Sequence, residues 1–177
     1  SLPSPLLPGG SDPFSLPWPA GTGRGHEGGR PPVRPGAPPR RLWIERPVLD
    51  AMFAASLQAA PAEACGLLGG RDGVATSHYP VPNVAPEPTE RFVMDPAGQR
   101  EAFTAMERRG EELVAIYHSH PSTGASPSKA DLLSAHYLDA FYLIVGLRQG
   151  RPYLRAFRIH PRTRAAVEVR WLAVRPR

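Results

Sequence analysis

The sequence has little cysteine, no long apolar run and no secretory signal. Cys65 is the only cysteine among 177 residues, so the chain can form no internal disulfide and cannot hold zinc through several thiolates. No apolar stretch approaches the roughly 20 residues of a membrane-spanning helix, and the first ten residues lack the basic start of a secretory signal. We therefore expect a cytoplasmic protein with no membrane partner.

The part of the chain that we expect to fold also carries little net charge. The net charge is +5 and the sequence pI is about 10.0. Five arginines and two acidic residues in the first 41 positions account for +3 of this charge, which leaves +2 for the rest of the chain. A balance this small, without a stripe of basic and aromatic residues, predicts no nucleic-acid partner.

The chain divides by composition near residue 40. Residues 1–40 are roughly half proline and glycine with no collagen period, which is typical of a disordered extension. An alternative is a short docking motif around Phe14 and Trp18, two aromatic side chains that could anchor on a partner. Residues 41–177 have the composition of one folded domain.

Helical and strand patterns alternate through this domain. Amphipathic spacing predicts helices over 46–60, 96–110 and 128–140, the first with apolar Val48, Leu49, Met52, Phe53 and Leu57 on one face. Apolar or alternating runs predict strands at 41–45, 64–70, 74–81, 91–95, 112–120, 141–147, 152–159 and 165–174, the last two as a closing hairpin. The sequence therefore predicts an α/β protein with one mixed sheet between layers of helices.

Two histidines at the end of the strand over 112–120 are candidate metal ligands. Side chains alternate along a strand, so His118 and His120 project from the same face while Ser119 projects from the other. A loop rich in Pro, Ser and Gly follows, and Asp131 lies in the first turn of the next helix. Two imidazoles and one carboxylate would leave the fourth position of a zinc ion open, as in a catalytic site.

Glu63 and Ser128 are the candidate catalytic residues. Such a metal lowers the pKa of a bound water and polarises a carbonyl, but a general base is still needed. Glu63 stands at the start of a buried strand, where burial would raise the pKa of its carboxyl toward a useful value. The Ser128 hydroxyl could donate to the oxyanion that develops on the attacked carbonyl.

Each of these residues also has an ordinary structural interpretation. Ser128 and Asp131 fit an N-terminal helix cap followed by an acidic residue three positions later. A His-x-His pair on a strand can arise by chance, and Glu63 alone could be a surface carboxylate. Only their occurrence together, in this order and on these elements, favours a metal site.

Two segments together resemble the motifs of the JAMM (MPN-plus) zinc metalloprotease family. "PAEACGLLGG" (61–70) resembles the segment that carries the family's catalytic glutamate, and "HSHPSTGASPSKAD" (118–131) resembles its metal motif. The resemblance extends over about residues 41–174 and implies the MPN fold, which is similar to that of cytidine deaminases. The short spacing between the motifs resembles that of the minimal bacterial and archaeal members.

The resemblance also implies a role for each matching residue. His118, His120 and Asp131 would hold one Zn²⁺, Glu63 would act as general base or acid, and Ser128 would support the tetrahedral intermediate. Ser119 would make local hydrogen bonds. Cys65 occupies a position where similar members often have cysteine, and we expect a structural role for it as a small buried residue.

The implied function is that of a metallopeptidase or isopeptidase. Members of the family cleave the amide bond after the Gly-Gly tail of ubiquitin-like proteins, and minimal members act on sulfur-carrier proteins of the ThiS or MoaD type. The bond could join the tail to a peptide extension, a cysteine or a conjugated protein. The tail would lie as an extended strand at a sheet edge, with residues 82–95 as the wall of its groove.

Three other functions compete with this one. A non-catalytic MPN scaffold would keep the fold but lose metal ligands, whereas all three are present here. A RadC-like protein has a similar histidine-containing motif but usually a helical DNA-binding segment, where this chain has a Pro/Gly-rich extension. A cytidine deaminase would need a pair of zinc-binding cysteines, which a chain with one cysteine cannot supply.

Overall fold

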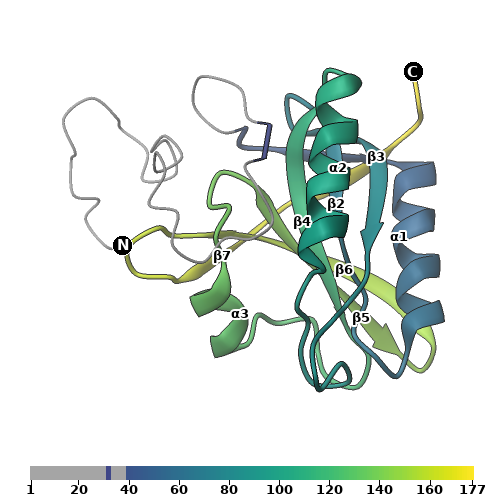
Figure 1. Cartoon of the computed structure of the whole chain (residues 1–177), viewed down its shortest axis with the longest axis vertical. Helices are drawn as coiled ribbons and strands as arrows, with labels where there is room; N and C mark the ends of the chain where they lie inside the picture. The colour runs from purple at the N-terminus through teal and green to yellow at the C-terminus, as the bar shows by residue number, and fades with distance from the viewer. Residues whose placement is uncertain (1–30, 33–38) are drawn as a thin grey trace.

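The computed structural model describes residues 31–32 and 39–177, and the strands in these residues form one mixed sheet in the order β7-β6-β5-β4-β2-β3-β1-β8 (Figure 1). The strands are β1 (Leu42–Glu45), β2 (Cys65–Arg71), β3 (Val74–Val81), β4 (Glu112–His120), β5 (Phe141–Arg148), β6 (Arg151–Ile159), β7 (Ala166–Val169) and β8 (Trp171–Val174). The helices are α1 (Arg46–Ala59), α2 (Pro96–Arg108) and α3 (Lys129–Ser134). β4 lies inside the sheet, antiparallel to β2 and parallel to β5. The predicted α/β class with a mixed sheet is confirmed.

Helix α1 covers one face of the sheet. Pro47 fits its first turn, where a backbone N–H has no helical partner to lose. Val48, Leu49 and Met52 are buried and belong to a core cluster that includes side chains of β2, β4 and β5. Leu57 was expected on this face but is exposed, because the buried stripe passes through Ser56 instead.

Helix α2 covers the opposite face and lies in front of β2 and β4 in Figure 1. The Asp95 carboxylate caps its start by accepting a hydrogen bond from the Gly98 N–H at 3.3 Å. Phe103 and Met106 are buried in a second core cluster with side chains of β2 and β4. Gly110 follows the helix with φ +66°, a conformation that glycine adopts without strain.

The predicted hairpin of β2 and β3 is present at the centre of the sheet. The strands pair antiparallel across Asp72 and Gly73, which both have positive φ, as a tight hairpin turn requires. All residues of β2 except Arg71 are buried, because helices cover both faces of this strand. Glu63 and Ala64 precede β2, which places them beside the end of β4.

Three predicted elements were wrong. Residues 91–95 do not form a strand: Met94 makes one isolated bridge to Asn83, and the Asn83 side chain bonds other backbone groups of this loop. The helix over 128–140 ends at Ser134, because the chain then turns Tyr137 into the core beside Phe103. The run 165–174 divides into two strands, so only β7 pairs with β6.

The second of these two strands completes the other edge of the sheet. β8 pairs with β1 in parallel, with Trp43 opposite Leu172 and Ile44 opposite Ala173. It therefore lies at the edge opposite β7, although only Arg170 separates the two strands in the sequence. Two consecutive peptide links span less than about 8 Å, so the two edges of the sheet approach each other at Arg170. The Trp171 indole N–H accordingly donates to the Leu154 carbonyl of β6 at 3.1 Å.

The predicted extension, residues 1–40, lies mostly outside the described residues, as do Phe14 and Trp18 of the alternative docking motif. Two described parts of it touch the domain. The Pro32 carbonyl accepts a hydrogen bond from the Leu113 N–H at 2.9 Å, and the Pro39 carbonyl accepts one from the buried Arg158 guanidinium. The boundary near residue 40 and the disorder of the extension stay predictions.

No helix within the described residues is both long enough and apolar enough to span a membrane.

Candidate metal centre

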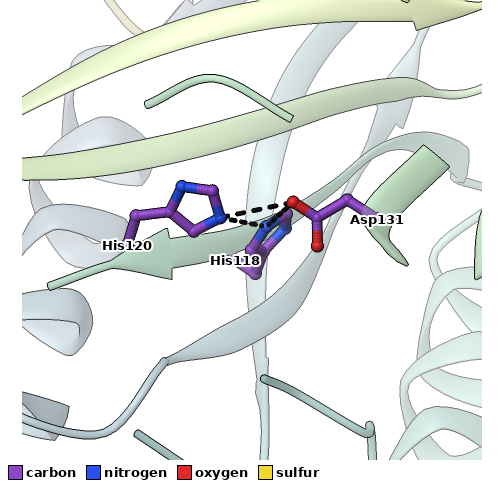
Figure 2. Close-up of side chains that lie close together, drawn as sticks. All are labelled: His118, His120 and Asp131. Carbon is purple, nitrogen blue, oxygen red and sulfur yellow. Dashed lines mark hydrogen bonds and ion pairs between the residues drawn. The ribbon is translucent and has the colours of Figure 1, made fainter. Parts of the chain in front are cut away.

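Three predicted ligands converge at the carboxyl end of β4, as Figure 2 shows. The Nε2 atoms of His118 and His120 lie 3.1 Å apart. Asp131 Oδ2 lies 3.2 Å from Nε2 of His118 and 3.3 Å from Nε2 of His120. One atom from each side chain thus faces the same point.

The local fold explains this convergence. His118 and His120 lie on the face of β4 that also carries Ile116 and is covered by α2, and both imidazoles are buried. The loop after β4 reverses the chain and brings the start of α3 back over the strand end. Two buried imidazoles and the Asp131 carboxylate therefore meet at the end of β4.

His120 has a tautomer fixed by its backbone partner. Its Nδ1 lies 2.8 Å from the carbonyl oxygen of Gly124, and a carbonyl can only accept a hydrogen bond. Nδ1 therefore carries the proton, and in the neutral ring the lone pair is on Nε2, the atom that faces Asp131. Metal-binding histidines are commonly oriented in this way through the other ring nitrogen.

Asp131 is held in place by the cap of α3. The Ser128 hydroxyl accepts a hydrogen bond from the Asp131 N–H at 3.0 Å, and Asp131 Oδ2 accepts one from the Ser128 N–H at 2.8 Å. This reciprocal pair is a capping box, so the structural interpretation of Ser128 is confirmed. The carboxylate oxygen that faces the histidines is therefore fixed by the helix start.

The charges of the three groups are coupled. Burial raises the pKa of the Asp131 carboxyl, but its interactions with His118 and His120 and the hydrogen bond from the Ser128 N–H outweigh burial and hold this pKa well below its usual range. Burial lowers the pKa of His118, which favours its neutral form. Burial also lowers the pKa of His120, but its interactions with Asp131 and the Gly124 carbonyl outweigh burial and raise this pKa. Neutral imidazole and ionised carboxylate are the forms that bind a metal.

Glu63 is buried near this cluster without a full set of partners. Its side chain is 7% exposed, and Oε2 has no hydrogen-bond partner among the described residues. Burial raises the pKa of its carboxyl to about 7, while the charge of His120 lowers this pKa and that of Asp131 raises it. A buried carboxyl with a free oxygen and a pKa near neutrality can accept and return a proton.

Ser119 connects Glu63 to the metal ligands. Its hydroxyl accepts a hydrogen bond from the Ala64 N–H at 2.8 Å, and its own N–H donates to the Ala64 carbonyl at 2.9 Å. The residue between the two histidines is thus bonded to the residue after Glu63. The predicted local hydrogen-bonding role of Ser119 is confirmed.

Sequence reasoning missed Asn83, which organises the loop beside Glu63. Its Nδ2 donates to the carbonyls of Glu63 and Arg91, both at 3.0 Å. Its Oδ1 accepts from the N–H groups of Ala85 and Val93, also both at 3.0 Å. An Asn after a strand, at the start of a Pro-rich loop, is typical of such side-chain turns and was an available signal.

Phe92 is the second residue that the sequence did not reveal. The sequence predicts a strand at Phe92, but its ring lies in a loop and stacks on His118 with centroids 4.4 Å apart and planes 22° from parallel. The apolar ring covers one side of the imidazole and limits its rotation. No periodicity could have shown this contact, because Phe92 lies in an irregular loop.

Cys65 is buried beside the site. Its thiol donates to the Val81 carbonyl at 3.4 Å, and burial raises its pKa to about 12. A thiol in this state is a poor nucleophile and a poor metal ligand. These observations support the structural role expected for it.

The residues at this centre fit a zinc ion. Two imidazole nitrogens and one carboxylate oxygen, all within 4.8 Å of one another, are the kinds of donor found in catalytic zinc sites. A polar group bound at the centre would give the unpartnered Oε2 of Glu63 a hydrogen-bond partner. The other predicted residue, Ser128, lies at the rim of the cluster and is joined to it through Asp131.

Comparison with known proteins places this arrangement in a family. The model of prokaryotic homologs of the JAB domain matches residues 45–160, which include Glu63, the two histidines and Asp131. The chain belongs to this family. The JAMM resemblance predicted from the two motifs is therefore confirmed.

Curated relatives of this JAB-domain chain carry functional names. A probable TtuB-protein conjugate cleaving protease of Thermus thermophilus is 39% identical over 113 residues, which cover 64% of this chain and 75% of the relative. A CysO-cysteine peptidase of Mycobacterium tuberculosis is 38% identical over 121 residues, covering 67% and 82%. A solution structure from Desulfitobacterium hafniense covers 76% of this chain and 94% of its own, with 34% identity and a TM-score of 0.68.

Proposed function

We propose that this protein is a zinc metallopeptidase that hydrolyses the amide bond after the Gly-Gly tail of a ubiquitin-like or sulfur-carrier protein. The observation that carries the proposal is the buried, incompletely partnered Glu63 carboxyl beside two imidazoles and a carboxylate that share one point. The names of the relatives, a conjugate cleaving protease and a CysO-cysteine peptidase, support the same reaction class.

His118, His120 and Asp131 would hold one Zn²⁺ per chain. When bound there, zinc would polarise the carbonyl under attack and lower the pKa of the attacking water. Neighbouring groups orient the three donor side chains. Gly124 directs the lone pair of His120, the cap of α3 fixes Asp131, and Phe92 restrains the His118 ring.

Glu63 would move the proton during hydrolysis. With a pKa near 7, its carboxylate can take a proton from the attacking water at neutral pH and deliver it to the leaving amine. The two bonds of Ser119 to Ala64 keep the Glu63 backbone beside the end of β4. The same carboxyl therefore serves as general base and then as general acid.

Ser128 would stabilise the oxyanion without leaving its cap. Its oxygen accepts the Asp131 N–H, which leaves the hydroxyl proton free to donate. A donor at this position would strengthen its hydrogen bond as negative charge develops on the carbonyl oxygen. The cap and the catalytic role of Ser128 are thus compatible.

The tail of the substrate would approach along the loop of residues 82–95. Val84 and Val93 are exposed at 50% and 46%, and the Val84 N–H bonds to the Val93 carbonyl at 2.8 Å. An extended tail could pack on these apolar side chains on its way to Glu63, whose N–H bonds to the Pro88 carbonyl of the same loop. A cytoplasmic location would give access to sulfur-carrier proteins.

Intact-mass spectrometry tests this function. The zinc-loaded protein is incubated with a sulfur-carrier protein that bears, after its Gly-Gly, a short peptide, a cysteine or an isopeptide-linked lysine. We expect release of at least one of the three, with no release by Glu63→Gln. Failure to cleave any of them, with zinc bound, would contradict the proposed substrate class.

A further inference from the structure

Three paired residues form a row across β4, β5 and β6 beside the metal centre. His120 of β4 pairs with Gly146 of β5, and Gly146 pairs with Tyr153 of β6. Neighbours in such a row project from the same face of the sheet. A histidine and a tyrosine therefore flank a position that has no side chain.

The Tyr153 ring occupies the space above Gly146. A Cβ on Gly146 would lie 2.3 Å from Cζ of Tyr153 and 2.6 Å from its hydroxyl oxygen, far inside van der Waals contact. The ring therefore leans across β5 toward the loop that follows His120. The Arg148 guanidinium lies over the Tyr153 ring, 5.2 Å from its centroid.

The Tyr153 hydroxyl reaches one particular peptide group of that loop. It accepts a hydrogen bond from the Ala125 N–H at 3.1 Å. The carbonyl of the same peptide group belongs to Gly124 and accepts the Nδ1–H of His120 at 2.8 Å. Tyr153 and His120 thus hold opposite ends of one planar peptide.

We propose that Tyr153 is a positioning residue of the metal centre, acting through the Gly124–Ala125 peptide to keep Nε2 of His120 directed at Asp131. Because a peptide group is planar, fixing its N–H also fixes the direction of its carbonyl. The proposal rests on the proposed function to the extent that His120 is a zinc ligand. Ligand orientation by outer partners commonly affects metal affinity tenfold or more.

Neighbouring contacts hold the same loop but leave this peptide to Tyr153. Ala125 is buried against Ile144 and Phe157, which anchors the loop to the sheet. Arg155 donates to the Ser126 hydroxyl at 2.9 Å. Apart from the bond from His120, the bond to the Tyr153 hydroxyl is the hydrogen bond described for the Gly124–Ala125 peptide.

The variant Tyr153→Phe removes the hydroxyl and keeps the ring. Its zinc dissociation constant, measured by competition with a chelator, should rise about tenfold. In the metal-free protein at alkaline pH, the ¹⁵N shifts of the His120 ring should move from a single Nδ1–H tautomer in the wild type toward a mixture. Tyr79→Phe is the matched control, because it loses a hydroxyl bond to Glu111 and should change neither quantity.

Gly146→Ala provides a second variant of the opposite kind. Its new methyl group would displace the Tyr153 ring, so it should reproduce both changes while the hydroxyl remains in the chain. The proposal is overturned if Tyr153→Phe binds zinc within twofold of the wild type and leaves the His120 ring shifts unchanged. Absence of zinc binding by the wild type would instead contradict the proposed function, and the ring shifts would still decide the role of Tyr153.

Discussion

Replacing Glu63 by glutamine should remove a loss of stability that the metal-free protein undergoes as the pH rises through about 7. The Glu63 carboxyl is 7% exposed, and burial raises its pKa from 4.5 to about 7. Its pKa in the folded state therefore exceeds its value in the unfolded state, and the folded protein binds this proton more tightly. A group of this kind contributes stability below pH 4.5 that is lost as the pH rises through about 7.

The size of the effect follows from the shift in pKa. Each pKa unit corresponds to about 1.4 kcal/mol, so the complete loss is about 3 kcal/mol above the folded-state pKa. Glutamine has no proton to lose and escapes this penalty. The free energy of unfolding of Glu63→Gln minus that of the wild type should therefore increase by about 2–3 kcal/mol between about pH 5 and about pH 8.

Urea unfolding followed by circular dichroism, with a chelator present, measures this difference. Any constant cost of the new amide cancels, because only the change with pH is used. Glu101→Gln, the same exchange at an exposed position of α2, is the matched control for the substitution itself. A difference for Glu63→Gln that does not vary with pH would refute the claim that burial perturbs this carboxyl.

Three further predictions concern other residues of the site. His120→Ala should lose bound zinc, because two protein ligands remain, and full zinc occupancy by elemental analysis would argue against the ligand set. Cys65 is buried and its pKa is raised to about 12, so it should resist iodoacetamide in the folded protein at about pH 8 and react fully in guanidinium. Rapid alkylation of the native protein would contradict its burial. Asn83→Ala should lower the free energy of unfolding by about 2 kcal/mol in chemical denaturation, because several backbone groups lose their partner, whereas a change under about 0.5 kcal/mol would show that water replaces the side chain.

Local patterns in the sequence were enough to predict the framework of the site. Continuous apolar runs predict the strand over 112–120 and the strand after Glu63, because a strand covered on both faces is buried along its length. His118 and His120 share a face because side chains alternate along any strand. Ser128 and Asp131 form the cap that their spacing predicts.

Features that depend on tertiary contacts were not predictable in this way. Helical spacing continues past Ser134, but burial of Tyr137 against Phe103 stabilises a turn there instead. The run around Arg170 looks like one strand, and nothing local shows that its second half pairs with β1. Phe92 on His118, and Tyr153 on the peptide after Gly124, join residues whose proximity only the fold creates.

The separate roles of Glu63 and the metal ligands are tested by comparing the wild type with Glu63→Gln, both loaded with zinc. Zinc content and cleavage of a sulfur-carrier conjugate are measured on the same samples. We expect equal zinc in both proteins and cleavage by the wild type alone, since Glu63 would move the proton while His118, His120 and Asp131 would hold the metal. Cleavage by Glu63→Gln at a rate near that of the wild type would contradict this assignment of roles.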